Sequence, residues 1–155
     1  MSRVRYCLPV FAAESLRFQE TDPKSNLIQK LQRSQNDMLR IVTGSRRRDR
    51  VRIVDMLEST GFLSVNQTSA YSLLLELWKS REFCVPFLSD LLERRRNDER
   101  NLRSDSAGKL STVGRDSLAL NSEHLWNLSS ERFRTTNLLS IAKIEAKKVA
   151  KSLPI

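Results

Sequence analysis

The stretch from Ser64 to Arg81 constrains the fold more than any other part of this sequence. Ser64 followed by Gln67 three residues later is a capping box, an arrangement of side chains that opens a helix. The helix that follows is the most apolar in the chain, with Tyr71, Leu73, Leu74, Leu75, Leu77 and Trp78. Because a helix that is apolar on nearly all sides must be enclosed by other elements, we expect it to be the central element of the core.

The other helices are predicted from apolar periodicity and from their start and stop residues. A first helix should begin after Asp22-Pro23 and stop at Gly44, with an apolar face made of Leu27, Ile28, Leu31, Met38, Leu39, Ile41 and Val42. A short helix from about Arg50 to Ser59 should end at Gly61, and a fourth should run from Pro86 to Arg96. A last helix, capped by Thr136 or Asn137, should end near Ser152.

Residues 97–121 interrupt the helical pattern with Ser, Asp, Gly and Arg, which predicts a long loop with one short strand near 109–113. The composition, with only four glycines and with 29% charged residues, suits helices better than sheets. The predicted fold is therefore mainly α, an irregular bundle of about five helices with at most minor strand content. A chain of 155 residues can form it as one domain or as two small lobes sharing a core.

The formal net charge of +9 favours nucleic acid or another anionic surface as a partner. Two cysteines, Cys7 and Cys84, supply neither a disulfide framework nor a zinc cluster. The apolar run at 6–13 is broken by Pro9 and followed at once by charged residues, unlike a signal peptide. Since no run approaches the ~20 apolar residues that span a bilayer, we expect a nuclear or cytoplasmic protein that is not secreted and has no membrane partner.

Arginines concentrate around the predicted end of the first helix. Arg40 precedes Gly44, and the segment after it holds a single acid, Asp49, among Arg46, Arg47, Arg48, Arg50 and Arg52. Cations at a helix C-terminus are favourable by about 0.3–1 kcal/mol each, but one or two suffice and a cluster repels itself. An external polyanion relieves that repulsion, so we expect these arginines to bind nucleic-acid backbone. A solvated surface and a nuclear-localisation signal are the alternatives.

A second basic set lies on the last predicted helix, where Lys143, Lys147 and Lys151 share one stripe at spacing i, i+4 and i+8. A phosphate-binding stripe and a solvated helix face fit this pattern equally well. The two basic sets can form one binding surface only if the fold brings them side by side. Residues 50–80 also allow a DNA-reading helix-turn-helix, with polar residues presented at the start of its second helix, although core packing fits the later apolar residues better.

Sequence signals for catalysis are missing. His124 is the only histidine and stands beside Leu125-Trp126, which favours a packing or hydrogen-bonding role. There is no adjacent pair of aspartates, no glycine-rich phosphate loop and no metal-ligand spacing. On its own, the chain is predicted to be no enzyme, to need no cofactor or metal, and to bind no small-molecule substrate.

Several blocks of the sequence resemble one family. The first reads Leu31-Gln32-x-x-Gln35-Asn36-x-Met38-Leu39-Arg40-Ile41-Val42-Thr43-Gly44, with Arg46-Arg47-Arg48-Asp49-Arg50-Val51 after it. Others are Tyr6-Cys7-Leu8-Pro9-Val10-Phe11, Asp55-Met56-Leu57, Gly61-Phe62-Leu63-Ser64-Val65-Asn66-Gln67, Leu77-Trp78-Lys79, Leu125-Trp126-Asn127 and Lys151-Ser152-Leu153-Pro154-Ile155. Together they resemble the region after the palm of non-LTR (LINE-like) retrotransposon reverse transcriptases, over nearly the whole chain. One departure is Leu128-Ser129-Ser130-Glu131, where relatives commonly carry a proline turn.

This resemblance implies descent from an RNA-directed DNA polymerase, as its thumb and C-terminal extension. Residues 1–22 would be a strand-like remnant of the palm–thumb junction, 23–96 a helical thumb-like domain, 97–121 a loop, and 122–155 a helical extension. The metal-binding aspartates of the family lie in a palm and fingers part that this sequence lacks, and that part would be a partner. By analogy, residues 46–52 would contact template RNA or an RNA–DNA hybrid. A non-catalytic fragment that binds nucleic-acid backbone is therefore expected, and a purely structural or interaction domain is the alternative.

Overall fold

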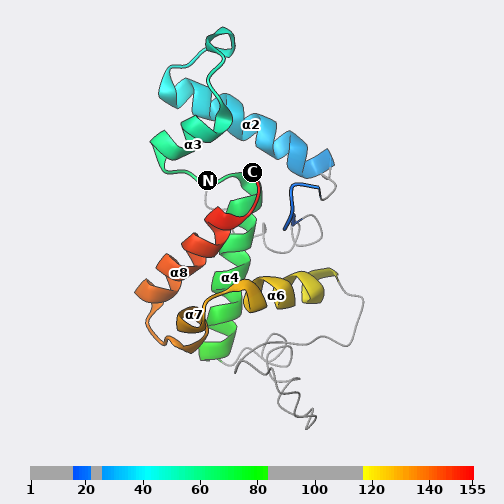
Figure 1. Cartoon of the computed structure of the whole chain (residues 1–155), viewed down its shortest axis with the longest axis vertical. Helices are drawn as coiled ribbons and strands as arrows, with labels where there is room; N and C mark the ends of the chain where they lie inside the picture. The colour runs from blue at the N-terminus through cyan, green and yellow to red at the C-terminus, as the bar shows by residue number, and fades with distance from the viewer. Residues whose placement is uncertain (1–15, 22–25, 84–116) are drawn as a thin grey trace.

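The computed structural model describes residues 16–21, 26–83 and 117–155. It contains six α-helices and one short 3-10 turn, and no strand in these ranges (Figure 1). The elements are α2 (Asn26–Thr43), η2 (Arg47–Asp49), α3 (Ile53–Thr60), α4 (Val65–Phe83), α6 (Ser117–Leu128), α7 (Glu131–Thr135) and α8 (Leu139–Ser152). The predicted mainly-α fold class is confirmed. None of the described helices combines the length and apolar character needed to cross a membrane.

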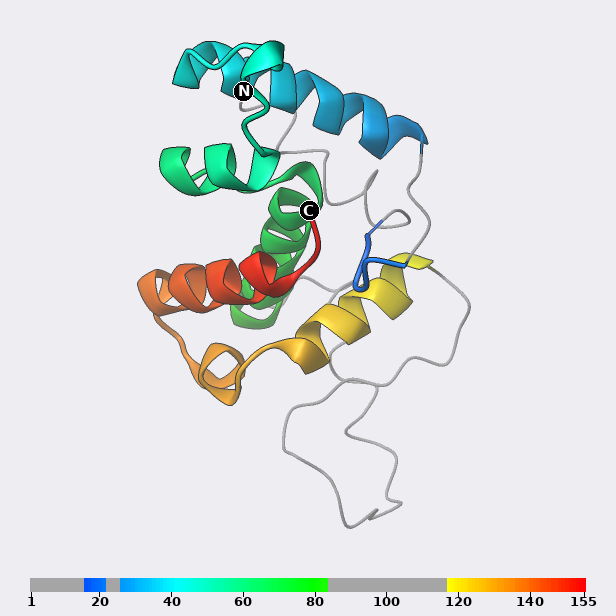
Figure 2. The same ribbon diagram turned by 45° about the horizontal axis from the view of Figure 1, so that its top comes forward.

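Helix α4 is the central element, as its sequence predicts. It packs against α8, α6 and α2, while α2 also packs on α3 and α7 on α8. Figures 1 and 2 show α8 beside α4 and α6 crossing it, with α2 and α3 gathered at its N-terminal end. Leu74 and Leu77 are fully enclosed, and their neighbours Leu73 and Trp78 are nearly so. Burial of this kind on most sides follows from the apolar residues that the helix carries around its circumference.

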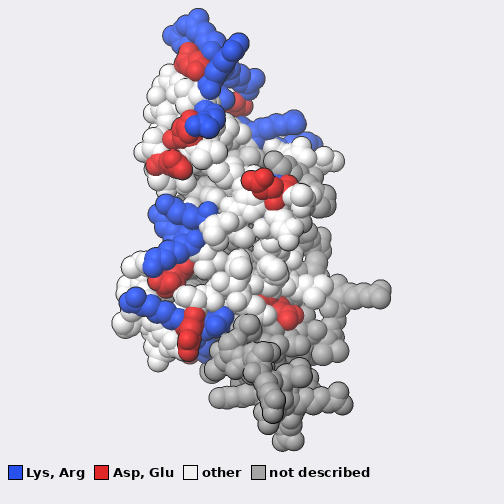
Figure 3. Space-filling model, in the orientation of Figure 1, with Lys and Arg blue, Asp and Glu red and all other residues white. Residues whose placement is uncertain are grey.

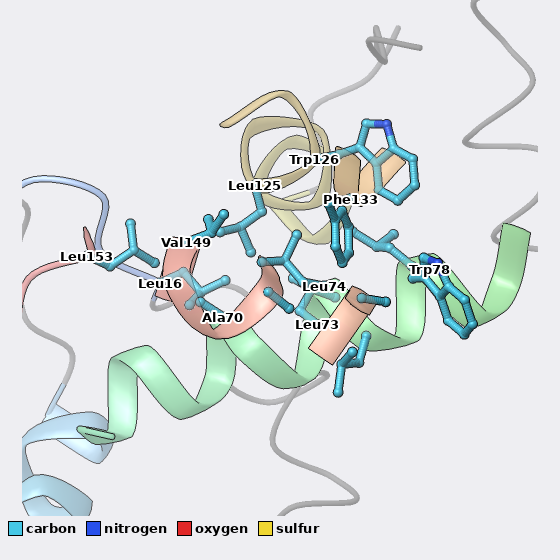
Figure 4. Packing of buried hydrophobic residues seen from close by; sticks show 14 residues of the cluster. Leu16, Ala70, Leu73, Leu74, Trp78, Leu125, Trp126, Phe133, Val149 and Leu153 are labelled. Carbon is cyan, nitrogen blue, oxygen red and sulfur yellow. The ribbon is translucent and has the colours of Figure 1, made fainter. Parts of the chain in front are cut away.

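The main hydrophobic core lies between α4, α6, α7 and α8 (Figure 4). Phe133 of α7 has no exposed surface and meets Trp126 of α6 edge to face, with ring centroids 5.7 Å apart. The indole of Trp78 donates a hydrogen bond to the main-chain oxygen of Thr136 at 2.9 Å, so its polar edge is satisfied. The other buried members are Leu16, Ala70, Leu73, Leu74, Leu75, Leu77, Leu125, Ala142, Ala146, Val149 and Leu153.

Helices α2 and α3 enclose a second, smaller cluster made of Leu39, Met56 and Leu57. Side-chain amides join this pair of helices to the connection before α4. Gln35 donates to the main-chain oxygen of Leu63 at 2.6 Å, and Gln32 accepts from the main-chain N–H of Val65 at 2.9 Å. The polar residues of the first family-like block thus have a structural role between helices.

The predicted start and stop signals of three helices are confirmed. Gly44 and Gly61 follow α2 and α3 with φ of 70° and 69°, a conformation that glycine adopts without strain. At the start of α4, Ser64 Oγ accepts from the N–H of Gln67 and Gln67 Oε1 accepts from the N–H of Ser64, both at 3.2 Å. This reciprocal pair is the capping box expected from the sequence.

Some predicted boundaries were wrong. Residues 117–121 were expected in a loop but belong to α6, so the boundary proposed at residue 122 falls inside a helix. Helix α7 was not predicted. The N-cap of α8 is Leu138, not Thr136 or Asn137, although Thr136 Oγ1 accepts the N–H of Leu138 at 3.2 Å. Residues 16–21 contain a bend and a turn and no strand. The predicted segments 1–15, 86–96, 97–116 and the strand at 109–113 lie outside the described residues.

The predicted apolar face of α2 was only partly right. Ile28 and Leu39 are buried, but Leu27, Met38, Ile41 and Val42 are exposed. The hydrogen bonds of Gln32 and Gln35 fix the rotation of the helix about its axis, so that one edge of the apolar face and not its centre meets the core. Periodicity located the apolar face correctly, and the polar contacts decided which way it points.

Candidate nucleic-acid interface

The segment 44–52, called the arginine loop from here on, joins α2 to α3 and forms one end of the molecule (top of Figure 1). Gly44 ends α2 in the left-handed region, and its N–H donates to the main-chain oxygen of Ile41 at 3.3 Å. Arg46 is extended, the turn η2 follows, and Arg50 has a φ of 52°. A non-glycine residue in the left-handed region is uncommon and carries a small conformational cost, so the main chain at Arg50 is strained.

The only acid of the arginine loop holds its main chain in place. Asp49 Oδ2 accepts the N–H of Arg46 at 2.6 Å, and the N–H of Asp49 donates to the main-chain oxygen of Arg46 at 3.0 Å. Hydrogen bonding of a carboxylate to the N–H groups of a turn is a common way to close it. Asp49 therefore orders the loop without a recorded ion pair to any of its arginine side chains.

Two of the five arginines in the loop have an acidic partner. Arg47 Nη2 lies 2.9 Å from Asp37 Oδ1 of α2, and Arg52 Nε lies 3.2 Å from Asp55 Oδ2 of α3. Both arginine side chains are still 81% exposed, and exposed pairs of this kind contribute roughly 0–1 kcal/mol. These contacts orient the two guanidinium groups and leave most of their donors available.

The other three arginines of the loop, Arg46, Arg48 and Arg50, are exposed. Across the described ranges, no hydrogen bond or ion pair is recorded for their guanidinium groups. Each guanidinium offers five N–H donors in a planar fork, which suits the oxygens of phosphate. The loop thus presents several cationic forks to solvent within one short segment.

Arg40 differs from the loop arginines. It lies in the last turn of α2 and is only partly exposed. Its Nη1 is shielded from solvent and has no hydrogen-bond partner in the described part of the chain. The predicted role of Arg40 in binding is therefore the least supported by exposure among the six arginines named from the sequence.

The lysine stripe of α8, made of Lys143, Lys147 and Lys151, is exposed along its length. The opposite face of the helix is buried through Ala142, Ala146, Val149 and Ala150. Lys148 lies beside the stripe, and its Nζ is 2.8 Å from Glu145 Oε1. That hydrogen bond, and after it the one from Ser130, lowers the pKa of the Glu145 carboxyl.

The two basic surfaces remain separate in the fold. Figure 3 shows Lys and Arg side chains at the end formed by the arginine loop and again along α8, on the same side of the molecule. Acidic side chains of α3, whose only acids are Asp55 and Glu58, lie between them. The arginine loop and the lysine stripe therefore do not merge into one continuous cationic patch on this face.

The polar residues at the start of α4 are committed to internal contacts. Asn66 Oδ1 accepts the N–H of Arg17 at 2.9 Å, while its Nδ2 donates to the main-chain oxygens of Arg17 and Pro154 at 2.9 and 3.0 Å. Gln67 Nε2 donates to the main-chain oxygen of Leu153 at 3.0 Å. Both side chains are buried, so in this structure they cannot reach base edges as a recognition helix would require.

We call Arg17, Asn66, Gln67 and the main chain of 153–155 the polar clasp. Within this clasp Arg17 is 4% exposed, and its guanidinium donates to the main-chain oxygens of Ile155 at 3.3 Å and Glu20 at 2.7 Å. Sequence reasoning missed these residues as a group. The adjacent amides Asn66 and Gln67 at the start of an apolar helix were the only available signal, and their partners lie 49 to 88 residues away.

A hollow of about 770 Å³ opens beside the polar clasp, between residues 17–20, α3 and the segment 151–155. Its lining is mixed, with Phe18, Val54 and Phe62 next to charged Glu20 and Glu58. No group of three or more potential metal ligands occurs in the described ranges. The side chains that line the hollow therefore form no arrangement that suggests a reaction.

His124 has the packing role expected from the sequence. Its ring packs against that of Phe18, with centroids 4.2 Å apart.

Comparisons of the chain with protein-family models, with curated proteins and with solved structures gave no match.

Proposed function

We propose that this chain is the thumb-like C-terminal part of a non-LTR reverse transcriptase and that it binds the backbone of RNA or an RNA–DNA hybrid through the arginine loop, without catalysing a reaction. One observation carries the proposal: Arg46, Arg48 and Arg50 expose guanidinium groups for which the described structure records no internal partner. The family-like blocks of the sequence support the assignment to a polymerase.

Electrostatics explains why a polynucleotide suits this loop. The five arginines of the loop lie within nine residues and repel one another, and the single aspartate offsets only part of this repulsion. Phosphates relieve it further, and the counterions that they release add a favourable entropy. Forked contacts to phosphate are charge-assisted and stronger than neutral hydrogen bonds. The lysine stripe of α8 would make additional and weaker contacts, because lysine binds phosphate as a point charge.

The proposal implies a partner as well as a ligand. In a reverse transcriptase, the metal-binding aspartates belong to the palm, so a palm and fingers part on a longer or separate chain would supply the chemistry. This chain would hold the strand and the partner would extend it. A location in the nucleus or cytoplasm, where template RNA and target DNA are found, belongs to the same proposal.

Salt-dependent binding tests the proposal. We expect the affinity for a labelled RNA–DNA hybrid to fall steeply between 50 and 200 mM salt, since each phosphate contact contributes about −0.7 to −0.9 to the slope of log K against log salt. The triple variant Arg46→Ala, Arg48→Ala, Arg50→Ala should reduce the slope by about 2–3 and weaken binding roughly 100-fold at 100 mM salt. Single-stranded RNA, duplex DNA and heparin serve as competing ligands.

The matched control is Lys143→Ala, Lys147→Ala, Lys151→Ala, which removes the same charge from the other basic surface. If the arginine loop is the binding site, the arginine variant loses clearly more affinity than the lysine variant. Equal losses would indicate attraction by net charge alone. Little loss in the arginine variant would refute the proposal and favour the helical interaction domain, for which the exposed apolar residues of α2 are the supporting observation.

A further inference from the structure

Helix α2 exposes the centre of its apolar face to solvent. Leu27 is 55% exposed, Met38 47%, Ile41 81% and Val42 66%, and the spacing of all four places them on one face of the helix. Single exposed apolar residues are ordinary, but four on one face of an 18-residue helix form a contiguous surface. Such a surface is characteristic of a contact with another polypeptide.

The spacing on this face fits a second helix. Leu27, Leu31, Ser34, Met38 and Ile41 are separated by four, three, four and three residues, which is the seam that two packed helices share. The small Ser34 in the middle of the seam allows close approach of a partner backbone. The larger apolar residues on either side of it fill the space along the contact.

We propose that this surface pairs with α2 of a second copy of the same chain, antiparallel and about a two-fold axis. In the register where Leu27 lies against Met38 of the second copy, Leu31 lies against Ser34. The same register sets Lys30, at the edge of the seam, against Asp37 of the second copy. Both of these charged residues are exposed, and Asp37, which contacts Arg47 of its own chain through Oδ1, keeps its second carboxylate oxygen for Lys30 of the second copy. The face is therefore complementary to itself in charge as well as in shape.

Charge also decides the direction of pairing. A parallel pair would bring both arginine loops to the same end, where five arginines on each copy would repel those on the other. An antiparallel pair places the loops at opposite ends, about 35 Å apart from the rise of 1.5 Å per residue along α2. This distance is close to one turn of B-form DNA, which matters only if the proposed function extends to duplex DNA, whereas the dimer itself does not depend on the proposed function.

Sedimentation equilibrium of the whole chain without nucleic acid tests the dimer. A single pair of short helices forms a small interface, so we expect self-association between about 10 µM and 1 mM. Leu27→Lys with Met38→Lys should raise the dissociation constant at least tenfold, because a cation is placed in the apolar seam. The matched control Ile144→Lys changes a residue of α8 that is 58% exposed and should leave association unchanged.

Charge exchange tests the register. Lys30→Asp alone should weaken the dimer about tenfold by setting two acids against each other, and adding Asp37→Lys should restore it. A helical circular dichroism spectrum in each variant shows that folding is retained. A chain that stays monomeric to 1 mM overturns the dimer and leaves the surface to another polypeptide. A dimer insensitive to the seam variants overturns the assignment to α2, and failure of the charge exchange to restore association overturns the antiparallel register.

Discussion

Asn66 joins three parts of the chain that are far apart in sequence, and its replacement by alanine is expected to be strongly destabilising. The residue is 4% exposed and makes three hydrogen bonds of 2.9–3.0 Å to the main chain of Arg17 and Pro154. Each bond contributes about 0.5–1.5 kcal/mol, and the donor and two acceptors left behind are not all able to reach water. Asn66→Ala should therefore lower the free energy of unfolding by about 3 kcal/mol.

Urea denaturation followed by circular dichroism measures this loss, and Tm should fall by roughly 10 °C. Hydrogen exchange adds a local readout, because the N–H of Arg17 should be protected in the unmodified chain and exposed in the variant. Asn137→Ala is the control, since this asparagine is exposed and its one recorded contact, from Arg81, is at 3.5 Å. The control should change stability by less than about 0.5 kcal/mol.

The variant Asn66→Asp tests the same hydrogen bonds through the pH dependence of stability. It keeps an oxygen to accept the N–H of Arg17 but turns a second oxygen toward the main-chain oxygens of Arg17 and Pro154. The introduced carboxyl should therefore have a raised pKa, so stability should be lowest at neutral pH and should recover as acidification protonates it. A loss below about 1 kcal/mol in the alanine variant, or equal losses in variant and control, would refute the role assigned to the polar clasp.

Three further changes probe the core, the acid limit of stability and the loop. Phe133→Ala should cost about 3–5 kcal/mol in urea denaturation, because it empties a fully buried site. Hydrogen bonds from Lys148 and then Ser130 lower the pKa of Glu145, so its carboxylate stabilises the fold at pH values above 4.5, its ordinary pKa, and this effect is lost as the pH falls through the folded pKa. Glu145→Gln should therefore make Tm depend less on pH in the acid range. Arg50→Gly should raise the free energy of unfolding by about 0.5 kcal/mol by relieving the left-handed φ, and it should weaken polynucleotide binding; a loss of stability would contradict the strain at this position, and unchanged binding would contradict its role in the loop.

Local signals predicted helix ends better than helix surroundings. Gly44, Gly61 and the pair Ser64 and Gln67 act within a few residues of themselves, and each was placed correctly from the sequence. Residues 117–121 were assigned to a loop because polar residues precede them, yet they are helical. They form the first turn of α6, whose later residues Ser122, Leu125 and Trp126 are buried, so the helix begins earlier than local composition indicated.

The candidate interface was predicted in composition but not in geometry. The arginines of the loop are clustered in sequence, so their proximity needed no structure. Which of them have acidic partners depends on Asp37 and Asp55, and the pairing with Asp37 spans ten residues across the end of a helix. The separation of the loop from the lysine stripe by the acids of α3 likewise depends on how the helices are arranged.

The sequence by itself determined that this chain is mainly helical, that α4 is its central helix, and that a strongly cationic segment follows a glycine stop. These properties depend on neighbours along the chain, where periodicity and capping act directly. Only the tertiary structure decided which way α2 faces and what Asn66 and Gln67 bind. Their partners lie tens of residues away, and hydrogen bonds of fixed geometry between distant segments rotate a helix by amounts that its own apolar pattern cannot specify.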